Sequence, residues 1–297
     1  MHSRRTWRPQ GGGFQRFWRL FRRAWISAYE NNAFGVAKGA AYSALLAFFP
    51  VLSSISAILI QANADSVSRI LTRFIFEVVP PGTQEMIRTN LIEHGSRPVA
   101  LLVTGSLVSL FAASGLMVTL MDGFSAAYRI SSGRSFWKQR AVAMLLSFTA
   151  ALPLILASSL MVFGAHLEAE VLQGLGLLGE GEALRGSIYV AGEILRYFVA
   201  LCSVVVSLAS LYYLGPKHPD RGTHNVWPGA MVATVLWLVA TAGFAWYVRN
   251  VANYNVMYGS IAAVVALIVW MYVLSIIALV GCEYNAELYR FQTQGLP

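Results

Sequence analysis

The chain has 297 residues, of which 57% are hydrophobic and only 12% are charged. A soluble domain carries about 25% charged residues, and a soluble core of this length could not bury so much apolar surface, so the composition indicates a membrane protein. The net charge is +8, with seven arginines in the first 23 residues. Membrane topology and anionic lipid head groups explain this charge better than nucleic acid does, and we expect no nucleic-acid partner.

The first expected element is an amphipathic helix in the stretch FQRFWRLFRRAWISAY. Its apolar residues repeat at helical spacing and fit within about 120° of arc, while the arginines point elsewhere. This pattern is typical of a helix that lies on an anionic leaflet; the alternative is a cytosolic helix packed on the bundle. The residues expected at the lipid interface are Arg16, Trp18, Arg19, Arg22, Arg23 and Trp25.

Six apolar segments follow, each long enough to cross a bilayer, which takes about 20 residues per helix. They cover residues 36–60, 99–121, 141–165, 187–214, 226–248 and 258–282. None alternates like a barrel strand. The predicted fold class is therefore all-α, a polytopic membrane protein with six transmembrane helices.

The predicted domain organisation follows from these segments. Residues 1–35 form a basic cytoplasmic segment, residues 36–283 form the transmembrane domain, and residues 284–297 form a cytoplasmic tail. The loop 61–98 is too long for a bare connector, and its apolar stripes predict two amphipathic helices that cap the outer face.

The distribution of basic residues predicts the orientation of the chain. Fourteen Lys and Arg residues fall on the side of the N-terminus and six on the opposite side. Under the positive-inside rule, both termini are cytoplasmic.

Small residues in the first two spans predict a close helix–helix contact. They recur every four residues, which lets two helices approach closely, and they are Gly35, Gly39, Ser43 and Ala47 in the first span and Gly105, Ser109 and Ala113 in the second. Pro50 removes a backbone donor and bends the first span. Two interpretations remain open: tight packing with a kink, or a bend that lines a cavity.

Charged residues near the bilayer are costly and are candidates for a functional site. Lys38, Asp122 and Glu283 lie at the cytoplasmic ends of three spans, where they could form a cluster. End anchoring and internal pairing are the alternatives. Further candidates for a substrate pathway are Tyr42 and Pro50 in the first span and, toward the outer side, Glu193, Arg196, Arg249, Tyr254 and Tyr258.

Signals of a soluble enzyme are missing from the chain. There is no GxxxxGK[ST] loop, and the five histidines form neither HExxH nor a dense cluster. The two cysteines, Cys202 and Cys282, lie in apolar runs and predict neither a disulfide nor a metal site. We therefore expect no enzyme activity, no metal and no cofactor.

Five stretches, in order, resemble the YihY/BrkB family of bacterial inner-membrane proteins over about residues 30–290. They are GAAYSALLAFFPVL, FIFEVVPPGTQEMI, SSGRSFWKQR, WPGAMVATVLW and YGSIAAVVALIVWMYVLSIIALVGCEYNAEL. The chain departs from the family in having Cys282 where Ala is usual. The resemblance implies a family that has been described as a ribonuclease (historically ribonuclease BN), a serum-resistance factor and a transporter, with links to envelope lipids. The ribonuclease label finds no support in these residues.

Two functions are therefore expected. The first is transport, with a lipid or another amphipathic envelope substrate passing through a cavity between helices. The second is a non-transporting role in envelope assembly, as a scaffold that binds an envelope protein. Membrane lipids with anionic head groups are the expected partners, and a homo-oligomer remains open.

Overall fold

The computed structural model describes residues 13–61, 99–130, 134–174, 182–217, 225–250 and 261–294. Within these residues there are seven helices and no strand, which confirms the all-α prediction. The helices are α1 (Gly13–Glu30), α2 (Ala33–Gln61), α5 (Val99–Ala127), α6 (Phe136–Gly174), α7 (Glu182–Leu214), α8 (Trp227–Asn250) and α10 (Ile261–Gln294).

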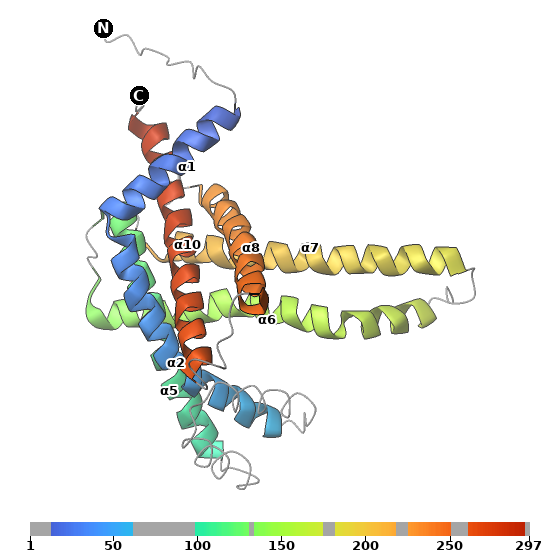
Figure 1. Cartoon of the computed structure of the whole chain (residues 1–297). Coiled ribbons are helices and arrows are strands. Elements are labelled where there is room, and N and C mark those ends of the chain that lie inside the picture. The colour runs from blue at the N-terminus through green and yellow to red at the C-terminus, as the bar shows by residue number, and fades with distance from the viewer. Residues whose placement is uncertain are drawn as a thin grey trace.

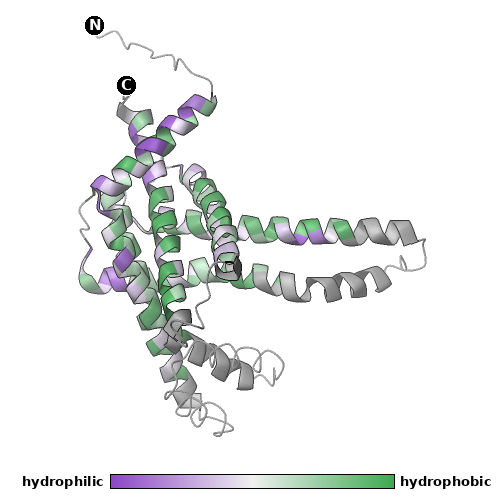
Figure 2. Cartoon of the chain, in the orientation of Figure 1, coloured by the Kyte–Doolittle hydropathy of each residue, from purple (hydrophilic) through white to green (hydrophobic). Residues whose placement is uncertain are grey.

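Five of these helices are long and apolar enough to cross a membrane. The apolar stretches are Val103–Ala127, Phe136–Ala157, Val190–Leu214, Trp227–Tyr247 and Val264–Thr293. In α2, the described apolar stretch is shorter, Ala33–Phe48. The structure thus shows a membrane protein with several spanning helices, and the count of six spans stays a prediction. Figure 2 shows how hydrophobic residues cover most of the described helices.

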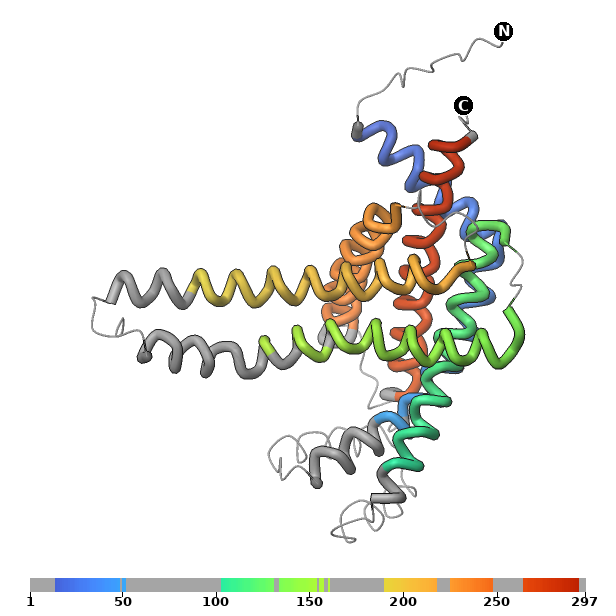
Figure 3. Tube along the Cα trace, turned by 180° about the vertical axis from the view of Figure 1, so that it is seen from behind, coloured from blue at the N-terminus to red at the C-terminus, as the bar shows by residue number. Residues whose placement is uncertain are grey.

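The helices form two groups that run in different directions. The helices α2, α5 and α10 lie along one another, α8 packs beside α10, and α1 crosses the end of α10 that leads to the C-terminus (Figure 1). The pair α6 and α7 forms a hairpin that runs crosswise to the first group, as the view from behind also shows (Figure 3). The predicted boundary at residue 283 falls inside α10, which continues to Gln294.

The core is built from small side chains on α2 and larger ones on the helices around it. One face of α2 buries Ala33, Ala37, Ala40, Ala44 and Ala47. Such a face lets a neighbouring backbone approach closely, and α2 makes its most extensive contact with α5. On the other side of the core, the rings of Phe124 and Tyr212 meet edge to face at 5.4 Å.

A tight turn joins α1 to α2. Asn32 has a φ of 55°, the left-handed conformation that Asn tolerates at the end of a helix. Its side chain lies over Gly35, where a Cβ atom would come within 2.5 Å of the Asn32 Oδ1 atom. Gly35, predicted as a helix-packing residue, thus makes room for the turn.

The predicted amphipathic helices of the loop 61–98 lie outside the described residues, apart from the end of α2. The same holds for Tyr254 and Tyr258 and for the side chain of Arg249.

Candidate functional site

A buried polar cluster lies on α10 where this helix meets α1. Glu283, Glu287 and Arg290 follow one another at spacings of four and three residues, so they share one helix face. The Arg290 Nη2 atom donates a hydrogen bond to Glu287 Oε1 at 2.7 Å and lies 3.7 Å from Glu283 Oε2. Only 2% of the Glu283 side chain is exposed. The arginine therefore balances two carboxylates that water barely reaches.

This cluster holds α1 and α5 against α10. The Ser27 hydroxyl donates to Glu287 Oε1 at 2.6 Å, and the Asn31 amide donates to Glu283 Oε1 at 2.7 Å. Arg290 also donates from Nη1 to the carbonyl of Ala127 at the end of α5, at 3.0 Å. Tyr128 is the residue after Ala127. Burial raises the pKa of its phenol far above the usual range, so the phenol stays neutral.

A second polar contact fixes α8 to α10. The Asn285 side chain accepts a hydrogen bond from the Gly229 backbone N–H at 2.7 Å and donates to the Val226 carbonyl at 2.9 Å. The Tyr212 hydroxyl of α7 donates to the Ala278 carbonyl of α10 at 2.8 Å. Asn285 therefore gives a partner to the Gly229 N–H, one of the first donors of α8, and is a second donor to the Val226 carbonyl, which also accepts from the Ala230 N–H.

The predicted cluster of Lys38, Asp122 and Glu283 does not form. Lys38 is exposed and makes no ion pair with the described residues. Asp122 accepts a hydrogen bond from Gln139 of α6 at 2.7 Å, and Glu283 is bound by Asn31 and Arg290. The sequence placed the three residues at one membrane level, but their helices present them to different neighbours.

The other pathway candidates are spread over the surface. Tyr42 is exposed on α2, and Glu193 is exposed on α7. Arg196 is half-buried one turn after Glu193. Nothing in the described part brings these three residues together into one site.

Gly39 and Ser43 of α2 lie where this helix meets α5, whereas Gly105 is exposed and Ala113 lines a groove between α5 and α6. A Cβ atom on Gly39 would lie 3.5 Å from the Thr119 side chain, and one on Gly115 would lie 4.0 Å from the Cβ of Ser43. At Pro50, the Ser109 hydroxyl of α5 lies 2.7 Å from the Pro50 carbonyl oxygen. Ser109 thus ties α5 to the point where proline interrupts α2.

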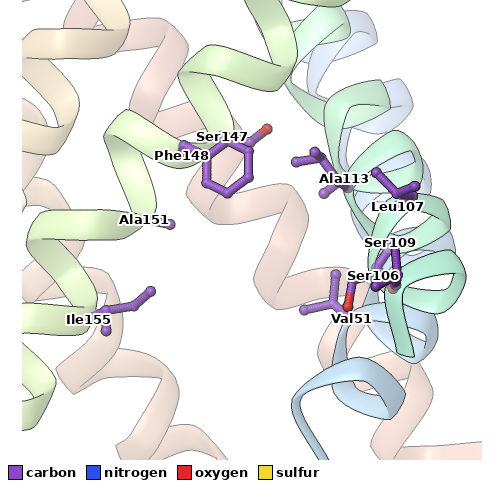
Figure 4. A pocket seen from close by; sticks show the side chains of 11 residues that line it. Val51, Ser106, Leu107, Ser109, Ala113, Ser147, Phe148, Ala151 and Ile155 are labelled. Carbon is purple, nitrogen blue, oxygen red and sulfur yellow. The ribbon is translucent and has the colours of Figure 1, made fainter. Parts of the chain in front are cut away.

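Beyond this contact, α5 and α6 diverge and leave an apolar groove of about 550 Å³. Figure 4 shows its two walls. Val51 of α2 also lines it, and the wall residues are Val103, Ser106, Leu107, Ser109, Leu110 and Ala113 of α5 and Ser147, Phe148, Ala151 and Ile155 of α6. Its volume falls in the range of small-molecule sites, about 300–1,000 Å³. The groove is apolar along most of its length, as an acyl chain requires.

A smaller cavity of about 240 Å³ lies inside the bundle, bordered by α2, α5, α6, α7, α8 and α10. Its walls are apolar except for Ser207 and Ser275. Both hydroxyls already donate to backbone carbonyls, Ser207 to Ala150 at 2.9 Å and Ser275 to Met271 at 2.8 Å. The central cavity therefore offers no unused polar group of this kind to a ligand.

Helix α1 presents three faces. One face, with Leu20, Ala24, Ser27 and Ala28, is buried. A second face is an exposed row of aromatic side chains, in which Trp18 is 59% exposed and stacks on Phe21. The third carries arginines, and Arg16, Arg19 and Arg23 border a small recess of about 40 Å³ beside Phe291. Helix α1 thus packs on α10, and its predicted contact with an anionic leaflet stays a prediction.

Sequence reasoning missed three residues that the structure makes prominent: Arg290, Asn285 and Arg140. Arg290 and Asn285 were assigned to a tail, although the apolar period of α10 continues past them. Arg140 served only as a topology marker. Its position directly before an apolar run was a usable signal, because a long side chain at such an end can reach back along the helix.

Comparison with known proteins adds a family to this geometry. Residues 24–296 match the family described as "Virulence factor BrkB". The chain belongs to this family. The match includes α2 to α10 and the end of α1 from residue 24, so most of the BrkB bundle described above is part of the family's own sequence pattern.

Two of the relatives of this BrkB chain are membrane proteins by name. It is 28% identical to a UPF0761 membrane protein of Vibrio cholerae, over 84% of this chain and 79% of the relative, and 27% identical to one of Vibrio campbellii, over 84% and 75%. It is also 26% identical to YfkH of Bacillus subtilis, named ribonuclease-like, over 85% and 91%. No solved structure matches the chain. In the described part, no three His, Cys, Asp or Glu residues gather as a metal site would need.

Proposed function

We propose that this BrkB-family protein is a transport protein of the bacterial inner membrane that translocates a lipid or another amphipathic envelope substrate. The observation that carries the proposal is the groove between α5 and α6. It is apolar, has the volume of a ligand site, and lies between two helices long enough to span a membrane. A substrate with an acyl chain could enter such a groove sideways from the bilayer.

The bend at Pro50 supports the same proposal. Val51, the next residue, lines the groove, and Ser109 binds the Pro50 carbonyl from the opposite helix. Pro50 lies inside α2 and frees the carbonyl of Leu46, four residues earlier, so the Ser109 bond to the Pro50 carbonyl holds α5 to this position in addition to the bonds of the helix. Of the two interpretations of Pro50, the cavity-lining bend is thus the one that the proposal uses.

Reconstitution tests the proposal. Purified protein is placed in vesicles that carry a phospholipid with a fluorescent head group in both leaflets, and a membrane-impermeant quencher is added outside. Translocation would let the quencher remove nearly all fluorescence, whereas protein-free vesicles lose about half. The control protein is Ala151→Trp, which fills the groove. Equal traces for protein-containing and protein-free vesicles, with several lipid classes, would rule out lipid translocation.

We also propose that α1 contacts the anionic leaflet. Its exposed aromatic row and its arginines combine apolar area with positive charge, the two contributions that bind an interfacial helix. With α1 at the inner surface, both termini would be cytoplasmic. Cysteine labelling from the two sides of intact cells, at a residue before α1 and at one after α10, tests this orientation.

The alternative is a scaffold in envelope assembly without transport. One observation favours it: α1 is fixed to α10 by buried hydrogen bonds while its aromatic row stays exposed, as a docking site for an envelope protein would be. Crosslinking from Trp18 that repeatedly recovers one envelope protein, together with no translocation in vesicles, would favour the scaffold.

A further inference from the structure

Arg140 lies in the second turn of α6, seven residues before Ser147, which lines the groove. Its guanidinium carbon sits 3.9 Å above the ring of Phe111, and Nη2 donates to the Phe111 carbonyl at 3.1 Å. Phe111 follows Leu110 in α5, and Leu110 and Ala113 line the groove. Arg140 is therefore held by α5 in a fixed place.

The guanidinium has more donors than its neighbours use. An arginine carries five N–H donors, and the Phe111 carbonyl is the one hydrogen-bond acceptor that the described residues give it. The Nε atom is buried and has no acceptor within the described part of the chain. An anion bound here would accept hydrogen bonds from the remaining N–H groups of Arg140 and balance its charge.

The nearest acidic residue by sequence and fold does not neutralise this charge. Asp122 of α5 accepts its hydrogen bond from Gln139, the residue just before Arg140. No ion pair joins Arg140 to a carboxylate among the described residues. Gly115, one turn after Phe111, lies beside the guanidinium: a Cβ there would be in ordinary contact with Arg140 Nη1, at 3.9 Å.

The distance between Arg140 and the groove suits a phospholipid. Ser147, which lines the groove, follows Arg140 by seven residues, about 10.5 Å along a helix. Both residues lie within one apolar span, so the path between them runs along the membrane helix. A phosphate at Arg140 would leave its acyl chain to run along Phe148, Ala151 and Ile155.

We propose that the groove between α5 and α6 binds one anionic phospholipid, with its phosphodiester on Arg140 and an acyl chain between the two walls. Arginine suits this role because its planar fork matches phosphate oxygens. The inference rests on the proposed function, to which it adds the substrate class and the residue that recognises the head group.

The experiment is photocrosslinking in vesicles of zwitterionic phospholipid that contain the full chain. The probe is phosphatidylglycerol with a photoreactive group in one acyl chain, and mass spectrometry locates the adducts. We expect adducts on residues 103–113 and 147–155. Arg140→Gln should lower their yield about tenfold, because hydrogen bonds to a charged group are strong, whereas Lys138→Gln, an exposed neighbour, should not.

Two further arms keep the result decisive. Ala113→Trp fills the groove without changing charge and should also abolish the adducts, while size-exclusion profiles show that each variant is folded. A diacylglycerol with the same photoreactive chain but no phosphate should label the groove weakly.

The proposal is overturned if adducts spread evenly over all lipid-facing helices, if Arg140→Gln labels like the unchanged protein, or if diacylglycerol labels as well as phosphatidylglycerol. Adducts in the groove without translocation would refute the transport function alone. Translocation without groove adducts would refute this inference alone.

Discussion

The polar cluster on α10 contains Arg290, and Arg140 precedes the α6 wall of the groove by two turns, but the two arginines are used differently. Arg290 binds Glu287, lies near Glu283 and donates to a backbone carbonyl. Arg140 donates to one carbonyl and stacks on an aromatic ring, beside a groove of about 550 Å³. Arg290 has a structural role, because a carboxylate and a carbonyl of the chain accept its hydrogen bonds. Arg140 has N–H donors that no described residue accepts from, and these are the donors that the proposed phospholipid would use.

This difference makes a general prediction. Substitutions in the α10 cluster should lower stability, since each removes a partner from a buried polar group. Substitutions around the groove should leave stability nearly unchanged and alter binding or transport. The expected loss of stability is therefore largest at Arg290 and smallest at Lys38.

The substitution Arg290→Ala should have the largest effect. It leaves two buried carboxylates without their cation, and breaking a buried ion pair costs about 3–5 kcal/mol. Thermal unfolding in detergent should show a much lower midpoint. Arg290→Lys keeps the charge but loses the planar guanidinium. Its unfolding midpoint should lie between those of the unchanged protein and Arg290→Ala. An unchanged midpoint for Arg290→Ala would mean that the cluster contributes nothing to stability.

Two matched glycine-to-alanine substitutions should change the stability in opposite directions. At Gly281 a new Cβ would lie 2.5 Å from the Tyr212 hydroxyl oxygen and 2.7 Å from the Ala233 Cβ, so Gly281→Ala should destabilise by about 1–3 kcal/mol. At Gly243, also in a helix, a new Cβ meets nothing within 4 Å. Gly243→Ala should therefore stabilise by about 0.5–1 kcal/mol. Equal midpoints for the two variants would contradict the close approach of α8 and α10.

Ser109→Ala probes the wall of the groove. The hydroxyl lies 2.7 Å from the Pro50 carbonyl and 2.8 Å from the Gly105 carbonyl. Hydrogen bonds between membrane helices contribute about 0.6 kcal/mol on average, so the unfolding midpoint should fall only slightly. Ser203→Ala, whose hydroxyl donates within α7, is the control for losing a hydroxyl. A loss as large as that of Arg290→Ala would place the bend at Pro50 among the main determinants of the fold.

The sequence predicted the class of fold and the approximate helix limits for a simple physical reason. Apolar runs of bilayer length have one main solution, a helix, although α6 and α10 continue past the predicted ends at residues 165 and 282 to Gly174 and Gln294. Val99 and Leu214 are limits of helices in both the prediction and the structure. The small-residue row also placed Gly39 and Ser43 toward the neighbouring helix.

The site was harder to predict, because partners depend on how helices rotate and cross. Glu283 is bound by Asn31, 252 positions earlier in the chain, and no local spacing announces this contact. The crosswise direction of α6 and α7 likewise leaves no periodic signal in either helix. Charge alone grouped Lys38 with Asp122 and Glu283. In the structure the two carboxylates accept hydrogen bonds from neutral side chains instead, Asp122 from Gln139 and Glu283 from Asn31.

The substitution Lys38→Ala should have the smallest effect on stability and so gives the cleanest test of a pathway role. Lys38 is exposed and has no ion pair in the described part of the chain, and such surface changes stay within about 0.5 kcal/mol. If Lys38 guides a negatively charged head group along α2 past Tyr42, translocation in vesicles should slow while the unfolding midpoint stays constant. Lys138→Ala, another exposed lysine, is the control. If both variants translocate like the unchanged protein, Lys38 is an end anchor and the head group is recognised elsewhere, which would leave Arg140 as the basic residue at the groove.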